Sequence, residues 1–130
     1  MRIVYGTIVA VKRGEELLML KRANGEIDAG LWEFPTGTFE NHDLTIHATA
    51  ERELKEETGL EAIDMRYLGD IKRKDGNSMY IGYAYVVTRF GGSIALSKEH
   101  EEYRWLKRCE LANYEIDKNT LVFLQLYKDF

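Results

Sequence analysis

Hydrophobic residues along this chain fall into short stretches that are separated by turns containing glycine. In five of these stretches the pattern favours β-strands, and the β-branched residues of the first indicate a buried strand. The predicted strands cover residues 3–12, 16–22, 62–74, 78–89 and 102–106. Asp75-Gly76 lies between the third and fourth strands and is a strong hairpin signal, so we expect these two to pair.

Two other segments predict helices. Residues 45–58 have helical periodicity, and Gly59 follows them as the expected C′ residue. Residues 117–130 predict a closing helix with one apolar face. Strands combined with two main helices imply the α/β class, with a sheet packed against helices.

The helix predicted at 45–58 has acids where it should meet the rest of the protein. At roughly 100° per residue, Ile46, Ala50 and Leu54 form one apolar arc, with Glu57 inside this arc and Glu53 at its border. A solvated charged face would place its acids opposite the apolar residues.

Glu53, Glu56 and Glu57 therefore lie within one helical turn, an arrangement that destabilises a helix unless a cation neutralises it. Carboxylate oxygens in a tight group suit Mg²⁺ or Mn²⁺, and zinc is disfavoured because no Cys or His cluster accompanies them. Arg52 is adjacent and could orient Glu53. Taken alone, the cluster is equally compatible with a solvated or salt-bridged surface helix.

The surrounding motif favours the metal. Leu31-Trp32-Glu33-Phe34-Pro35-Thr36-Gly37 leads through a polar loop into Arg52-Glu53-Leu54-Lys55-Glu56-Glu57-Thr58-Gly59-Leu60. The stretch from Gly37 to Leu60 resembles the Nudix box, and its second half matches at every fixed position. The first half departs, because Asp43 stands at the Glu position and eight residues instead of seven separate it from Arg52. We interpret this as a one-residue loop insertion.

The resemblance implies a Nudix-type α/β/α sandwich with a mixed sheet between helices. It also implies a Mg²⁺-dependent reaction in which water attacks one phosphorus of a nucleoside diphosphate linked to a group X. By the same resemblance Glu53, Glu56 and Glu57 are metal ligands, the Gly37 backbone completes the metal and substrate site, and Arg52 orients Glu53.

Other site residues follow from weaker resemblances. Glu99 and Glu101 lie where many family members place an additional catalytic glutamate, although a solvated loop is equally compatible. His100 between them could contact phosphate or cap the loop. Arg22 resembles a nucleotide-contacting position, with an exposed strand-end arginine as the alternative. Asn119 lies where MutT-like members recognise a purine, with a helix cap as the simpler explanation.

Composition agrees with one compact domain over residues 1–130, since 45% of the residues are hydrophobic and no linker is visible. The single cysteine, Cys109, excludes an internal disulfide and suits a reducing cytoplasm. No apolar run is long enough to span a membrane. A net charge of −4 argues against binding long nucleic acid, but not against a small phosphorylated substrate.

Together with the resemblance to the Nudix box, these observations predict a cytoplasmic Nudix hydrolase with Mg²⁺ or Mn²⁺ as cofactor. The expected substrate is a nucleoside triphosphate, oxidised forms included, because the short chain is most similar to MutT-like pyrophosphohydrolases. Pro35 is the only proline, so the proline motifs of family members that act on ADP-ribose or NADH are missing. Alternatives are a catalytically weak module that binds a nucleotide or protein, or a hydrolase of dinucleoside polyphosphates or nucleotide sugars. Both a monomer and a homodimer remain open.

Overall fold

The computed structural model describes residues 1–130 as a mixed β-sheet flanked by two α-helices and one 3₁₀ helix. The elements are β1 (Arg2–Arg13), β2 (Glu16–Arg22), β3 (Trp32–Glu33), β4 (Thr36–Thr38), α1 (Ile46–Thr58), β5 (Glu61–Asp75), β6 (Ser78–Gly91), β7 (His100–Lys107), η1 (Arg108–Asn113) and α2 (Lys118–Leu126). All five predicted strands are present. The predicted hairpin is the β5–β6 pair.

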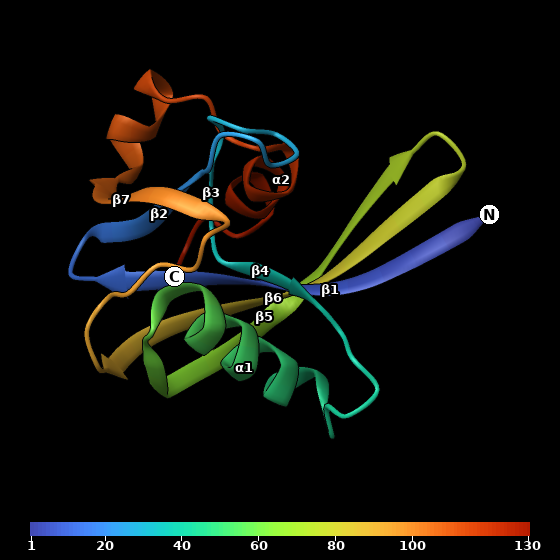
Figure 1. The fold of residues 1–130 in the computed structure, drawn as a ribbon, viewed down its shortest axis with the longest axis horizontal. Coiled ribbons are helices and arrows are strands. Elements are labelled where there is room, and N and C mark those ends of the chain that lie inside the picture. Colours follow the sequence, from blue (N-terminus) through green and yellow to red (C-terminus); the bar gives the residue numbers. More distant parts are fainter.

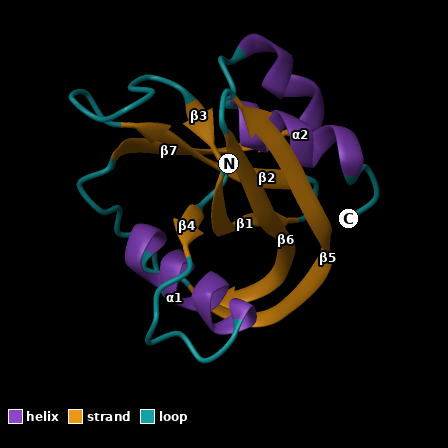
Figure 2. Cartoon of the chain, turned by 90° about the vertical axis from the view of Figure 1, so that its right-hand side faces the viewer, coloured by secondary structure: helices purple, strands orange, loops and turns teal.

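The sheet has the strand order β3-β2-β1-β6-β5, with β4 pairing with β1 and β7 pairing with β2. The central pair β1 and β6 is parallel, whereas the other pairs are antiparallel. Helix α1 lies on one side of this sheet and α2 on the other (Figures 1 and 2). The predicted α/β/α sandwich with a mixed sheet between helices is therefore confirmed.

Alternate residues of β1 serve two separate cores. Ile8 and Ala10 belong to the core that contains Phe123 of α2, whereas Val9 and Val11 belong to the core that contains Leu54 of α1. Because successive strand residues point to opposite faces, a buried strand between two helical layers must be apolar on both faces. This explains the continuous hydrophobic run that predicted the strand.

The bounds of α1 agree with the prediction. The Thr45 side chain caps the helix by accepting from the Ala48 N–H, and Gly59 ends it in the left-handed conformation with φ of 79°. The Gly59 N–H bonds to the Lys55 carbonyl oxygen, which satisfies one of the last helical acceptors.

The prediction of a helix over 117–130 was wrong beyond Leu126. Asp117 caps α2, but the segment after Leu126 leaves the helix. Its carbonyl groups bond to side chains from elsewhere, since Lys12 donates to the Phe130 carbonyl oxygen and Arg108 donates to that of Tyr127. These tertiary hydrogen bonds hold the segment after Leu126 in its non-helical conformation.

Candidate functional site

Strand β4 and helix α1 bring Gly37 against Glu53. A Cβ atom built on Gly37 would lie 1.9 Å from Cγ of Glu53, so only glycine leaves room for the carboxylate there. Gly6 of β1 has a related role, because a Cβ on it would lie 2.6 Å from the Gly37 carbonyl oxygen. Two glycines on adjacent strands thus let this carboxylate lie directly on the β4 backbone.

Arg52 holds two of the predicted metal ligands in place. Its Nη1 donates to Glu53 Oε1 at 2.8 Å and to Glu56 Oε2 at 3.2 Å, and its Nη2 donates to the Thr38 carbonyl oxygen. This is the orienting contact with Glu53 that the sequence predicts. Glu56 is the most exposed of the three box glutamates, whereas Glu53 is largely buried.

Asp43 does not reach the acid cluster and instead holds Arg52. Its two oxygens accept from Arg52 Nε and Nη2, both at 2.8 Å, and they also accept from the Thr49 hydroxyl and the Glu40 N–H. These bonds, the Arg52 guanidinium first among them, hold the Asp43 pKa well below its usual range. The loop insertion therefore leaves Asp43 as a support for the residue that orients Glu53.

We expect Asp43→Asn to destabilise the protein at neutral pH and to have little effect in acid. A lowered folded-state pKa stabilises the fold above the ordinary value of 3.8, and this contribution is lost as the pH falls below that value. Urea unfolding of both proteins at pH 7 and at a series of acidic pH values measures the difference. A difference that does not shrink in acid would contradict the charged Asp43–Arg52 contact.

Glu57 is buried and has no Lys or Arg side chain paired with it. The residue is 4% exposed, its side chain forms no ion pair, and the only hydrogen bond to its carboxylate comes from the Thr36 N–H to Oε1 at 3.3 Å. Burial, together with the charges of Glu33 and Glu53, raises its pKa well above the usual value. Burial likewise raises the pKa of Glu53, against the opposing effect of Arg52.

Glu33 and His100 complete a buried group with Glu57. His100 Nε2 lies 2.8 Å from Glu33 Oε2, and one ligand atom from each of the three residues lies within 4.8 Å of the others. His100 Nδ1 is buried and has no partner. The sequence assigns no role to Glu33 and predicts that His100 contacts phosphate or caps the loop. The only sequence signals for the pair were the Trp-Glu-Phe-Pro motif and the Glu-His sequence.

Arg22 and Glu99 lie at the edge of this group. Arg22 Nη1 is 3.6 Å from Glu33 and 3.9 Å from Glu99, and its Nε donates to the Ile27 carbonyl oxygen. Glu101 is exposed and forms no ion pair, because the pairing of β2 with β7 skips it: Lys21 pairs with Glu102 and Arg22 with His100. The structure thus brings Glu99, and not Glu101, to the acids.

Asn119 lies apart from the carboxylates, at the start of α2. Its Oδ1 accepts from Arg73 Nε at 2.7 Å, and Asp117 supplies the helix cap by accepting from the Thr120 N–H. Asn119 is therefore not the capping residue. It lines a cleft of about 180 Å³ formed by Asp28, Leu31, Arg73, Asp75, Asp117, Lys118 and Asn119.

The donor set fits a divalent cation. Glu53 and Glu57 offer oxygens in a partly desolvated setting, where uncompensated negative charge is unfavourable, and the Gly37 carbonyl lies on the adjacent strand. Hard oxygen ligands of this kind are the ones that Mg²⁺ and Mn²⁺ prefer.

The Nudix domain profile matches residues 2–127, which is nearly the whole chain. The chain is a member of the Nudix family. Among curated proteins, it is 34% identical over 116 residues to the asymmetrical bis(5'-nucleosyl)-tetraphosphatase of Rattus norvegicus, covering 82% of this chain and 76% of that protein. It is 26% identical over 127 residues to the CTP pyrophosphohydrolase of Escherichia coli K12, and this match covers 98% of this chain and 93% of that protein.

Solved structures of Nudix proteins share the fold. The MutT protein from Methanosarcina mazei Go1 superposes with a TM-score of 0.83 at 22% identity, covering 98% of this chain and 94% of that one. A MutT Nudix hydrolase from Burkholderia pseudomallei superposes with a TM-score of 0.82 at 20% identity. The match covers 96% of this chain and 98% of that one. The predictions of a Nudix fold and of a Nudix hydrolase are confirmed at the level of the family.

No helix in the structure has the length and apolar character needed to cross a membrane.

Proposed function

We propose that this Nudix protein is a Mg²⁺-dependent pyrophosphohydrolase, with one catalytic domain over residues 1–130. The proposed reaction splits a nucleoside diphosphate linked to X, and the substrate we favour is a nucleoside triphosphate, oxidised forms included. The products would be the nucleoside monophosphate and pyrophosphate. A relative with 98% coverage of this chain carries the name CTP pyrophosphohydrolase, which supports this choice.

The observation that carries the proposal is that the Glu57 carboxylate is buried and forms no ion pair. A carboxylate that is 4% exposed, lies beside Glu33 and Glu53, and receives one backbone N–H is destabilising unless a cation binds it. The same reasoning disfavours the alternative of a salt-bridged surface helix. A bound Mg²⁺ would neutralise phosphate charge and activate water, which is the main catalytic requirement in phosphoryl transfer.

The protein's own residues would divide the remaining work. Glu53, Glu56 and Glu57, with the Gly37 carbonyl oxygen, would hold the metal, and Arg52 would fix the orientation of Glu53. Arg22 lies between Glu33 and Glu99 and could donate to a phosphate oxygen of the substrate. Because Glu33 and His100 are buried beside Glu57, they would restrict how its carboxylate can turn.

We expect Glu99 to be the general base and Glu101 to be dispensable. Glu99→Gln should lower kcat about 10²-fold, since general-base catalysis typically contributes at least that much. Glu101→Gln should change kcat less than about twofold, because Glu101 is exposed and has no ion pair. Steady-state kinetics of the two variants at saturating Mg²⁺ checks this. The reverse order of effects would assign the base to Glu101.

We also expect Asn119 to contribute to base recognition. The cleft at Arg73 and Asn119 offers amide and guanidinium groups that are fixed by their mutual 2.7 Å hydrogen bond. Asn119→Ala should raise KM about tenfold for the preferred base and leave kcat nearly unchanged, because the lost contact is equal in ground and transition states. Lys128→Ala is a matched exposed control. A fall in kcat alone would place Asn119 elsewhere in the mechanism.

The decisive experiment is a substrate panel with product analysis. The purified protein is incubated with nucleoside triphosphates, oxidised purine triphosphates, dinucleoside polyphosphates and nucleotide sugars, in Mg²⁺, Mn²⁺ or chelator. Monophosphate plus pyrophosphate from one triphosphate, absent in chelator, would support the proposal. Comparison of the two metals at equal free concentration identifies the preferred cofactor.

A second candidate has its own support. The curated relatives from rat, mouse and pig are all named asymmetrical bis(5'-nucleosyl)-tetraphosphatase and are 34%, 30% and 28% identical to this chain. Turnover of a dinucleoside tetraphosphate to a triphosphate and a monophosphate would favour this substrate class. Nucleotide binding without turnover of any compound in the panel would favour the catalytically weak binding module.

A further inference from the structure

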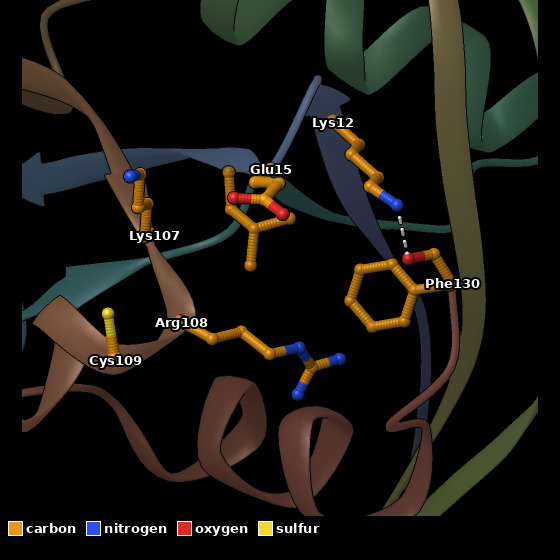
Figure 3. A pocket seen from close by; sticks show the side chains of 7 residues that line it. Lys12, Glu15, Lys107, Arg108, Cys109 and Phe130 are labelled. Carbon is orange, nitrogen blue, oxygen red and sulfur yellow. Dashed lines mark hydrogen bonds between the residues drawn. The ribbon is translucent and has the colours of Figure 1, made fainter.

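A second hollow lies at the other end of β7 from the acid cluster. It is a pocket of about 310 Å³ lined by Lys12, Glu15, Leu17, Lys107, Arg108, Cys109 and Phe130 (Figure 3). Strand β7 runs from His100 to Lys107, and at about 3.3 Å per residue its ends are roughly 23 Å apart. The pocket is therefore separate from the proposed catalytic site.

The pocket gathers three cationic side chains that form no ion pair with an Asp or Glu side chain. Lys12, Lys107 and Arg108 form no ion pair, and Glu15 is the only acidic side chain among the lining residues. The lining side chains thus leave a net charge of +2. A surface with excess positive charge around a hollow attracts an anion.

Contacts with the C-terminal segment fix two of these cations. Lys12 Nζ donates to the main-chain oxygen of Phe130 at 2.7 Å. Arg108 donates to the Tyr127 carbonyl oxygen at 2.6 Å and lies 4.5 Å from the centre of the Phe130 ring. Figure 3 shows both side chains pointing toward Phe130. Burial lowers the Arg108 pKa, and the charge of nearby Asp129 opposes this effect.

Apolar groups supply the rest of the wall. Leu17 is buried, and the Phe130 ring lies beside Arg108. A ligand with an anionic end and a flat or apolar body would satisfy both parts of the lining. Lys and Arg together are the usual residues for binding phosphate oxygens.

We propose that this pocket binds a phosphate group at a site distinct from the catalytic acids. The proposal does not depend on the reaction catalysed elsewhere. The same phosphate chemistry could come from inorganic pyrophosphate or from a nucleoside monophosphate. The test distinguishes these two sources.

Cys109 provides a local readout, because it is the only cysteine, is exposed and lines the pocket. Its alkylation by neutral iodoacetamide is followed with adenosine monophosphate, with inorganic pyrophosphate, or with potassium chloride at equal ionic strength. Chelator is present throughout, so that metal-dependent binding at the catalytic acids is suppressed. We expect at least fivefold slower alkylation at saturating phosphate ligand and no protection by chloride.

Variants assign the protection to this pocket. Lys107→Gln removes a side chain that has no ion pair, so folding should be unaffected, and protection should need about tenfold more ligand. Lys12→Gln should act in the same direction. Lys128→Gln removes the same charge from a nearby residue outside the lining and should match the wild type.

Protection by pyrophosphate alone identifies an inorganic ligand, and protection by the monophosphate identifies an organic one. No protection, or equal loss with Lys128→Gln, would overturn the proposal.

Discussion

Replacing Glu57 by Gln is expected to remove most of the activity while making the metal-free protein more stable. The carboxylate is buried beside Glu33 and Glu53 and forms no ion pair, so its charge opposes folding when no cation is bound. Gln keeps the size and the acceptor for the Thr36 N–H but removes the charge. It also removes a metal-binding oxygen anion, for which we expect a loss in kcat/KM on the order of 10³-fold.

The gain in stability should depend on pH in a defined direction. Burial raises the pKa of Glu57 above 4.5, so the folded protein binds this proton more tightly than the unfolded chain does. Between the ordinary and the raised pKa, stability of the wild type therefore falls as the pH rises. The Gln variant lacks this penalty. Its advantage should be absent below about pH 4.5 and grow as the pH rises toward neutral.

Urea unfolding in chelator at acidic and neutral pH measures this difference. Glu51→Gln is the matched control, since Glu51 is exposed on the same helix and should change neither activity nor stability noticeably. Added Mg²⁺ should raise the melting temperature of the wild type and not that of Glu57→Gln. A variant that retains activity within tenfold, or one that is less stable than the wild type at neutral pH, would refute the assignment of Glu57.

Helix α1 and its acids were predictable because their signals are local. The apolar arc of α1, its Thr45 cap and its Gly59 terminus all lie within fifteen residues, and the structure confirms that Ala50, Leu54 and Glu57 are buried on one face. Periodicity alone reveals such a face, since it depends only on residue spacing along one helix.

The Glu33–His100 pair was not predictable, because its members are 67 positions apart in the sequence. They meet only through strand pairing: β3 and β7 both pair with β2. Strands as short as the two residues of β3 have no periodicity of their own. The end of α2 was missed for the same reason, since Lys12 and Arg108 contact its C-terminal segment from distant parts of the chain.

Replacing Gly37 by Ala is expected to lower kcat/KM by roughly 10²- to 10³-fold, although the side chain added is a single methyl group. Its Cβ would lie 1.9 Å from Cγ and 2.1 Å from Cδ of Glu53, so the carboxylate must leave its place on β4. That movement would also break the 2.8 Å hydrogen bond from Arg52. The Gly37 carbonyl oxygen is retained, so the variant tests the position of Glu53 specifically.

A double-mutant cycle separates this effect from general damage to β4. In a Glu53→Ala background the colliding atoms are gone, so adding Gly37→Ala should cost little further activity and little further stability. Gly91→Ala is the matched control, because a Cβ there meets only Cδ1 of Ile63 at an ordinary 3.8 Å. Kinetics and urea unfolding of the four proteins of the cycle give both coupling energies. Additive losses in the double variant would show that Gly37 supports the site by some means other than making room for Glu53.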